Sequence, residues 1–253
     1  MPVLAHLSDI HLGQDHDGDA GARAAARAER VMTYLEQLPG PIDAVLVTGD
    51  IADHGLAAEY AEAARILASD RHPVLACPGN HDDRAAFRRD LLGEEASTGP
   101  VDRLHELPRL TVLMCDSGIP GRNEGAFGDD TLAWLDAALS RARRDVPAVV
   151  AFHHPPVDLH SPIPDGIRLR DEQRLAAVVR CHPQVKAVFC GHAHTGAVTR
   201  FAGLPLAVAP GVVSTGTLPW EGGSGLAFDH PPMIAFHVLD DDGRLTTHHR
   251  VVV

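Results

Sequence analysis

Short apolar runs alternate with helix-like segments up to Cys190, and this alternation limits the folds that the chain can adopt. The runs are rich in valine and leucine, as in strands buried on both faces: Val3–Leu7, Ala44–Thr48, Pro73–Cys77, Leu110–Cys115, Ala148–Phe152 and Val185–Cys190. The segments between them are rich in alanine, leucine, arginine and glutamate: Ala22–Leu38, Leu56–Ser69, Arg84–Leu92, Thr131–Arg143 and Asp171–Arg180. This order of strands and helices predicts a layered α/β protein with much parallel sheet.

The pattern changes after Gly196, where strand-like segments follow one another without an intervening helix. They are punctuated by glycine and proline and cover Ala197–Phe201, Leu206–Ala209, Met233–Leu239 and Leu245–Val253. We expect these four segments to form an antiparallel run that completes a second sheet. No internal repeat, low-complexity tract or long linker interrupts the chain, which predicts a single domain over residues 1–253.

Polar residues follow the ends of five predicted strands. The five blocks read Asp9-Ile10-His11, Gly49-Asp50-Ile51-Ala52-Asp53, Gly79-Asn80-His81-Asp82, His153-His154-Pro155-Pro156 and Gly191-His192-Ala193-His194. Because open α/β sheets bind ligands beyond the carboxyl ends of their strands, we expect these blocks to meet at one edge. Three glycines precede polar residues of the blocks and would let the backbone turn tightly there: Gly49, Gly79 and Gly191.

The donors in these blocks are carboxylates, imidazoles and an amide, without a thiolate. Such a mixture suits manganese, zinc or iron. Seven donors are too many for one tetrahedral site, but they form two sets of four if Asp50 serves both. That division is typical of a two-metal centre. One block alone would be weak support, whereas five blocks at five strand ends favour a metal centre over coincidence.

The five blocks resemble the signature of the calcineurin-like metallophosphoesterase superfamily. That signature is Asp-x-His, Gly-Asp-x-x-Asp, Gly-Asn-His-Asp/Glu, a strand-end His and Gly-His-x-His, and every element is present here without substitution. The chain is most similar to the bacterial class III 3′,5′-cyclic-nucleotide phosphodiesterases, through Cys115-Asp116-Ser117, the His-His-Pro-Pro block and a proline-rich approach to the last strands. The resemblance implies a four-layer α/β/β/α sandwich of two mixed sheets flanked by helices, with the metals at the sheet edge.

The resemblance also implies a role for each polar residue of the blocks. The first metal, commonly iron in such enzymes, would be held by Asp9, His11 and His194. The second, commonly manganese or zinc, would be held by Asn80, His153 and His192, and Asp50 would bridge the two ions. His81 would stabilise the phosphoryl group or protonate the leaving group. The residues expected to face the substrate are His11, Asn80, His81 and His194, and those expected to support the ligands are Asp53, Asp82 and His154.

The implied activity is hydrolysis of a phosphodiester, with 3′,5′-cyclic AMP to AMP first among the candidates. A hydroxide bridging the ions would attack phosphorus, with Asp50 and His81 as the catalytic residues. The metal ligands leave other substrates open: a glycerophosphodiester, a 2′,3′-cyclic nucleotide, a nucleotide pyrophosphate or a phosphomonoester. A non-catalytic binding scaffold is a remote alternative, because such proteins usually lose ligands and none is lost here.

Composition limits the partners and the compartment. The chain has 22 Lys and Arg against 34 Asp and Glu, and this net charge of -12 disfavours binding to nucleic acid or to an anionic membrane. Bound metals can still reverse the sign locally, so phosphate chemistry is not excluded. No apolar run approaches the roughly 18 residues of a membrane span, and no signal peptide is evident at the start. We expect a cytoplasmic enzyme with a small-molecule substrate and free cysteines, and a homodimer is left open.

Residues outside the five blocks carry weaker signals. Arg122 and Asn123 are the best candidates for contacts with a substrate phosphate or base, and Arg84 and Arg122 are the nearest expected counter-charges. We expect His16 to lie in a solvated loop. The remaining isolated histidines are predicted to be ordinary polar positions: His6, His72, His105, His182, His237, His248 and His249. Four segments are predicted to be mobile loops: Gln14–Ala20, Gly118–Gly128, Asp158–Arg170 and Leu218–Pro231.

Overall fold

Two mixed β-sheets lie face to face in the computed structural model, which describes residues 1–222 and 225–253. The strands of the first sheet stand in the spatial order β15 (Leu245–Val251), β14 (Met233–Leu239), β1 (Val3–Leu7), β2 (Ala44–Thr48) and β3 (Val74–Cys77). Those of the second stand in the order β10 (Ala197–Phe201), β11 (Leu204–Val208), β9 (Val185–Cys190), β7 (Ala148–Ala151), β5 (Leu110–Met114) and β4 (Arg103–Leu107). Two short pairs lie in loops: β6 (Gly125–Ala126) with β8 (Leu169–Arg170), and β12 (Thr215–Gly216) with β13 (Leu226–Ala227).

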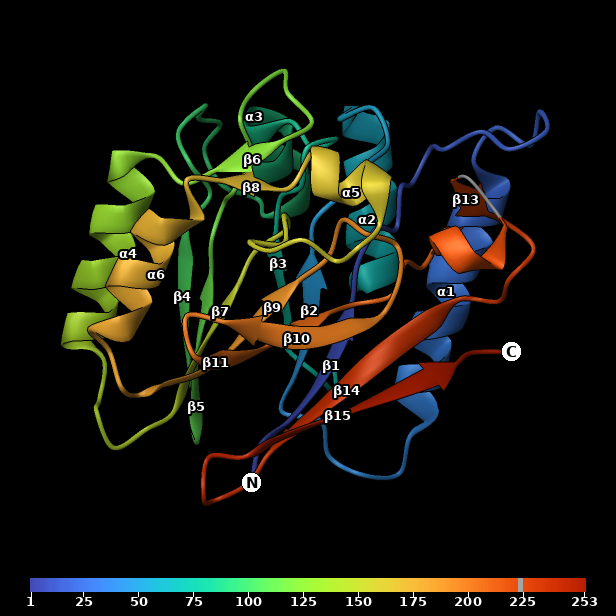
Figure 1. The fold of residues 1–253 in the computed structure, drawn as a ribbon. Coiled ribbons are helices and arrows are strands. Elements are labelled where there is room, and N and C mark those ends of the chain that lie inside the picture. Colours follow the sequence, from blue (N-terminus) through green and yellow to red (C-terminus); the bar gives the residue numbers. More distant parts are fainter. Residues whose placement is uncertain (223–224) are drawn as a thin grey trace.

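Helices cover the two outer faces of this pair of sheets (Figure 1). The first sheet is covered by α1 (Ala22–Gln37), α2 (Ala57–Leu67) and α3 (Arg84–Ala86), which continues as a π-helical turn over Phe87–Leu91. The second is covered by α4 (Asp129–Arg141) and α6 (Glu172–Arg180). The loops carry α5 (Pro162–Gly166) and a 3₁₀ turn, Pro219–Glu221. None of the helices in the described ranges combines the length and the apolar character that crossing a membrane requires.

Successive side chains of the buried strands divide between different cores, because neighbours along a strand point to opposite faces. In β2, Val47 packs with the helices of the first flank, whereas Leu46 faces the second sheet. In β7, Val150 packs toward α4 and α6, whereas Val149 faces the first sheet. Three apolar clusters therefore separate four layers, and the expected α/β/β/α sandwich is confirmed.

The last four strands do not form one antiparallel run, and this prediction was wrong. β10 and β11 extend the second sheet, where β11 pairs in parallel with β9. β14 and β15 instead extend the first sheet, where β14 pairs antiparallel to β1. The chain leaves the second sheet after β11 and enters the first sheet at β14. An apolar pattern shows that a segment is a strand, but it does not show which sheet edge is open to receive it.

Several elements have no counterpart among the predicted ones. β4 is an edge strand whose residues are half-buried or exposed in alternation, so it lacks the continuous apolar run of the central strands. The loops predicted to be mobile contain α5, β6, β8, β13 and the 3₁₀ turn, and β12 lies just before the last of these loops. The short strands pair with segments distant in the sequence, and the local sequence pattern does not predict such pairing.

The four cysteines are free thiols, as expected. Cys77, Cys115 and Cys190 are buried at the ends of strands, and Cys181 is exposed after α6. Burial raises the pKa of the three buried thiols well above the usual value, which keeps them protonated. They serve as small apolar core residues.

His6 and His237 are buried between the sheets, which corrects the prediction that they are ordinary polar positions. His6 Nδ1 lies 2.9 Å from His237 Nε2, and its Nε2 lies 2.8 Å from the Thr48 hydroxyl. His237 Nδ1 lies 2.9 Å from the Thr247 hydroxyl, and the ring of Phe189 stacks on His237 at 4.1 Å. All four ring nitrogens are paired, so these histidines serve as polar core residues.

We expect this pair to make the unfolding free energy steeply dependent on pH. Burial, together with the charge of His249, lowers the pKa of His6 to about 3, and burial also lowers the pKa of His237. Between the usual histidine pKa of about 6.5 and pH 3 the unfolded state therefore binds the extra proton, and stability falls as pH falls. Each such group adds up to about 1.4 kcal/mol per pH unit to the slope.

Denaturant titrations of chelator-treated protein between pH 6.5 and 4 measure this slope. His6→Gln should reduce it, whereas His248→Gln, at an exposed position of β15, should leave it unchanged. An identical slope in wild type and His6→Gln would contradict the prediction. The slope is the readout because His6→Gln lowers the absolute stability as well.

Candidate metal centre

The five polar blocks meet at one edge of the molecule, where strands of both sheets end. β1, β2 and β3 of the first sheet lead into Asp9, Asp50 and Asn80, and β7 and β9 of the second lead into His153 and His192. Backbone hydrogen bonds join the loops. The N–H of Asp9 donates to Gly49 O at 3.1 Å, the N–H of His11 to Asp50 O at 2.9 Å, and the N–H of Gly191 to His153 O at 2.9 Å.

The donor atoms of the blocks lie close together around Asp50. Its Oδ2 atom is 3.5 Å from His11 Nε2 and 3.3 Å from His153 Nε2. On one side, Asp9, His11 and His194 bring their donor atoms within 4.8 Å of one another. On the other side, His192 Nδ1 is 3.1 Å from His153 Nε2. Asp50 therefore lies between the two predicted sets, in the position that a shared ligand needs.

Hydrogen bonds orient three of the imidazoles with Nε2 toward the cluster. His153 Nδ1 donates to Thr48 O at 2.7 Å and His11 Nδ1 to the Asp53 carboxylate at 2.8 Å, because these oxygens can only accept. His194 Nδ1 pairs with the Ser214 hydroxyl at 2.8 Å. Partners of this kind are what hold metal-binding histidines in the correct tautomer.

Unpartnered polar atoms test whether these residues fit a cation. Within the described ranges, nine buried side-chain nitrogen or oxygen atoms have no hydrogen-bond partner. Four of them belong to the predicted ligands: Asp9 Oδ1, His11 Nε2, Asn80 Oδ1 and His192 Nε2. Buried polar groups are normally paired, so such a concentration at one place indicates a missing positive partner. The donor set fits metal ions.

The backbone of the blocks is strained. Five of the seven predicted ligands have a left-handed backbone, although none is glycine: Asp9, His11, Asp50, His192 and His194, with φ from 47° to 71°. Only five other non-glycine residues in the described ranges do so. Such strain costs of order 1–3 kcal/mol per residue and persists where the surroundings impose it, typically at functional sites. Close approach adds a second constraint, since a Cβ atom on Gly79 would lie 2.2 Å from Asp50 Oδ1.

The electrostatics of the cluster centre on Asp50. Burial alone would raise its pKa, but His153 and His11 outweigh burial and hold it well below the usual value. Burial would lower the pKa of His153, but Asp50 raises it to about 9. Burial lowers the pKa of His194 to about 4, and burial with neighbouring histidines lowers that of His192. The carboxylate thus draws positive charge into the cluster, while His192 and His194 stay neutral, as metal binding requires.

His81 lies at the margin of the cluster with 41% of its side chain exposed. Its Nδ1 donates to Asp53 O at 2.8 Å, and its backbone N–H donates to Asp50 Oδ1 at 3.0 Å. The ring of His81 packs edge to face against that of His11, with the ring centroids 4.7 Å apart. Because Nδ1 is engaged, Nε2 is the ring atom left to contact a substrate.

Of the three predicted supporting residues, only Asp53 hydrogen-bonds to a predicted ligand. Asp53 accepts from His11, and both ring nitrogens of His154 are engaged, by Ser117 Oγ at 2.8 Å and Asn123 O at 3.1 Å. Asp82, however, has no hydrogen bond or ion pair with a histidine in the described part of the chain. It accepts from the Tyr60 hydroxyl and from three backbone N–H groups, those of Ile51, Ala52 and Gly79. Asp82 therefore ties two ligand loops together through their backbones.

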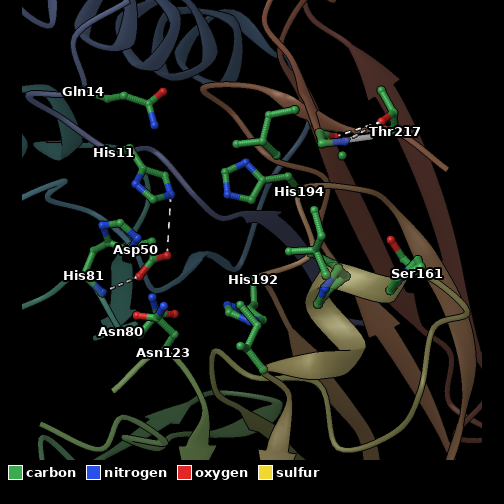
Figure 2. A pocket seen from close by; sticks show the side chains of 18 of the residues that line it. His11, Gln14, Asp50, Asn80, His81, Asn123, Ser161, His192, His194 and Thr217 are labelled. Atoms are coloured by element: carbon green, nitrogen blue, oxygen red, sulfur yellow. Dashed lines mark hydrogen bonds and ion pairs between the residues drawn. The ribbon is translucent and has the colours of Figure 1, made fainter. Parts of the chain in front are cut away.

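A cavity of about 520 Å³ opens beside the cluster. Figure 2 shows Asp50, Asn80 and His81 on one side of it, His192 and His194 in the middle, and Ser161 and Thr217 on the far side. Of the loop residues predicted to contact substrate, Asn123 lines the cavity. Arg122 is not among the described lining residues; it pairs with Glu124 at 2.9 Å. The ring of His16 stacks on that of Phe228, with the two ring centroids 4.3 Å apart.

Part of the lining was not predicted. Gln14 lies three residues after His11, and its side-chain oxygen is buried without a hydrogen-bond partner. α5 and Leu226 form the far side of the cavity. The proximity of Gln14 to the first block was an available signal, whereas Leu226 is distant in sequence from every block.

Comparison with known proteins finds relatives that are named as phosphoesterases or phosphodiesterases. The family model for calcineurin-like phosphoesterases matches residues 2–196. A probable cyclic nucleotide phosphodiesterase of Rhodococcus erythropolis is 37% identical over 87% of this chain and 74% of its own length. The glycerophosphodiester phosphodiesterase GpdQ of Enterobacter lignolyticus is 35% identical over 83% of this chain and 77% of its own length. The 3′,5′-cyclic adenosine monophosphate phosphodiesterase CpdA of Pseudomonas aeruginosa is 31% identical over 97% and 88%.

A solved structure shares the fold at low sequence identity. A dimetal phosphatase from Danio rerio superposes with a TM-score of 0.71 at 17% identity, covering 100% of this chain and 96% of its own. The match of the family model to most of the chain, together with relatives above 30% identity, settles the assignment. The chain belongs to the calcineurin-like phosphoesterase family.

Proposed function

We propose that this protein is a two-metal phosphodiesterase that hydrolyses 3′,5′-cyclic nucleotides, cyclic AMP first. The observation that carries the proposal is the position of Asp50, whose Oδ2 atom lies within 3.5 Å of His11 and 3.3 Å of His153. One carboxylate thereby links two groups of donors. The names of two of the relatives, a probable cyclic nucleotide phosphodiesterase and a cyclic AMP phosphodiesterase, support the substrate class.

The residues would hold two ions, iron with manganese or zinc. The first would be held by Asp9, His11 and His194, the second by Asn80, His153 and His192, and both by Asp50. When bound, two such ions supply an activated water and offset negative charge on the phosphoryl oxygens. Asp50 and the backbone of His81 are joined by a hydrogen bond of 3.0 Å, which fixes the His81 loop to the shared ligand.

His81 has the geometry of a leaving-group acid. Its Nδ1 is held by Asp53 O, so the imidazolium form would present the Nε2 proton to the departing ribose oxygen. The Asp53 carboxylate also lies close to this ring, with Oδ1 3.8 Å from Nδ1. Asn80, His11 and His194 line the same cavity and would position the phosphate between them.

The charge of the cavity favours a diester over a monoester. No lysine or arginine is among its lining residues in the described ranges. Arg84, expected as a counter-charge, is engaged with Asp116 at 2.7 Å, and Arg122 is engaged with Glu124. A monoester brings nearly two negative charges at neutral pH, against one for a diester. The dianion should therefore bind less productively, and the product AMP, itself a monoester, should leave readily.

A substrate panel tests the proposal. Purified protein supplied with Mn²⁺ at pH 7–8 should hydrolyse cyclic AMP, and bis-p-nitrophenyl phosphate should give a higher kcat/KM than p-nitrophenyl phosphate. Cyclic GMP, 2′,3′-cyclic AMP and glycerophosphoethanolamine complete the panel. Faster turnover of glycerophosphoethanolamine than of cyclic AMP would overturn the substrate class in favour of the activity named in the GpdQ relative. Monoester turnover equal to diester turnover would overturn the charge argument.

The cellular setting is also part of the proposal. We place the protein in the cytoplasm, because four free thiols suit a reducing compartment. We also propose that residues 1–253 form a single domain. Its net charge of -12 opposes nucleic-acid and membrane partners. A homodimer is tested by the molar mass in light scattering.

A further inference from the structure

The cavity beside the metal centre has two unlike walls. One wall carries the polar ligands and His81 (Figure 2). The other, which we call the apolar wall, consists of Pro162, Ile163, Pro164, Ile167, Pro219 and Leu226. A site for a wholly hydrated substrate would not need such a surface. Binding sites commonly pair a broad apolar surface with a few placed polar groups.

The side chains of the apolar wall do not fill the core. α5 has no buried residue, Ile163 is 60% exposed and Leu226 is 45% exposed. A contiguous group of large apolar side chains in contact with water, placed in a cavity, is typical of a ligand-binding surface. Trp220, which follows Pro219 in the sequence, is 73% exposed.

The apolar wall is nevertheless fixed in position. The Asp165 carboxylate accepts from the N–H of Leu159 at 2.6 Å and from that of Ser161 at 3.1 Å, which closes the turn of α5. Leu226 belongs to β13, which pairs with Gly216 of β12. The N–H of Gly216 in turn donates to the backbone oxygen of His194 at 3.0 Å. The apolar wall is thus built onto the loops that carry the ligands.

We propose that the apolar wall binds the nucleobase and thereby selects cyclic nucleotides over diesters of small hydrated alcohols. The inference rests on the proposed function, because it assumes that the phosphate is held at the metal centre. A base has flat ring faces with its polar groups on the edge, and burying a face against isoleucine and leucine side chains is favourable. A glycerol or ethanolamine group would gain nothing from the same surface.

Two variants at exposed positions test the inference. Ile163→Ser and Leu226→Ser should each weaken binding of the thiophosphate analogue Rp-cAMPS to the metal-loaded protein by about tenfold, since a large apolar contact is lost. Calorimetric titration measures this binding without turnover. KM for cyclic AMP should rise correspondingly, whereas kcat/KM for methyl p-nitrophenyl phosphate, which has no base, should stay within about twofold. Val198→Ser, also 60% exposed but on β10 outside the cavity, is the matched control.

The outcomes separate the inference from the proposed function. If wild type hydrolyses cyclic AMP but both variants bind Rp-cAMPS as tightly as wild type, the inference is wrong and the function stands. An equal loss on methyl p-nitrophenyl phosphate also contradicts it, because the substitutions would then act on the metal centre. If wild type hydrolyses methyl p-nitrophenyl phosphate and not cyclic AMP, the proposed function is wrong.

Discussion

Asp50→Ala should leave the protein without either metal ion and reduce phosphodiester hydrolysis to background. Its carboxylate lies between the two groups of donors, with Oδ2 3.5 Å from His11 Nε2 and 3.3 Å from His153 Nε2. Removing it also leaves the surrounding imidazoles without the negative charge that draws cations into the cluster. Elemental analysis of protein purified with Mn²⁺ should therefore find less than one ion per chain in place of two.

Single-site variants separate the two positions. His194→Ala should mainly deplete the site shared with Asp9 and His11, and Asn80→Ala the other. Asp136→Ala is a matched control, because Asp136 also pairs with a histidine, His182 at 2.8 Å, on the flank of α4. It should keep both ions. Two ions per chain in folded Asp50→Ala would contradict the assignment of Asp50 as the shared ligand.

His81→Ala should lower kcat for cyclic AMP by on the order of 10²–10⁴, the usual contribution of a general acid or base. Metal content should stay near that of wild type, because the hydrogen bond from residue 81 to Asp50 comes from the backbone N–H and survives the substitution. The loss should shrink for bis-p-nitrophenyl phosphate, whose leaving group needs little protonation. Steady-state kinetics on both diesters, with elemental analysis of each preparation, measure these effects.

The control for His81 is another histidine of the same edge. His16→Ala removes a side chain that stacks on Phe228 and is not among the described residues lining the cavity, so kcat should not change. An equal loss of kcat on both diesters in His81→Ala would contradict the role of leaving-group acid and favour electrostatic stabilisation. Loss of metal from that variant would contradict its placement outside the ligand set.

The central strands were predictable because both of their faces are buried. Val3–Leu7 and Ala44–Thr48 were predicted with the bounds that β1 and β2 have, and β9 likewise over Val185–Cys190. A strand between helices and a second sheet needs apolar residues at every position, which yields a continuous run in the sequence. The candidate ligands were found for a related reason, since each block stands directly after such a run.

The unpredicted features depend on contacts between distant segments. β4 has only two apolar residues in five, Leu104 and Leu107, and the last hairpin gave no sign that β14 pairs with β1. His6 and His237 are 231 residues apart, so neither reveals alone that it pairs with the other. Asp82 was expected to support a ligand histidine, but its carboxylate accepts from backbone N–H groups. Local patterns show which residues are polar, and only the fold shows which residues they contact.

The location of the metals is the most direct test of the proposal that two ions share Asp50. Crystals grown with Mn²⁺ should give two peaks in an anomalous difference map, about 3.5–4 Å apart as in two-metal sites. One peak should lie among Asp9, His11 and His194, the other among Asn80, His153 and His192, and Asp50 should reach both. A single peak, or two peaks without Asp50 between them, would contradict a two-metal centre with Asp50 as the shared ligand.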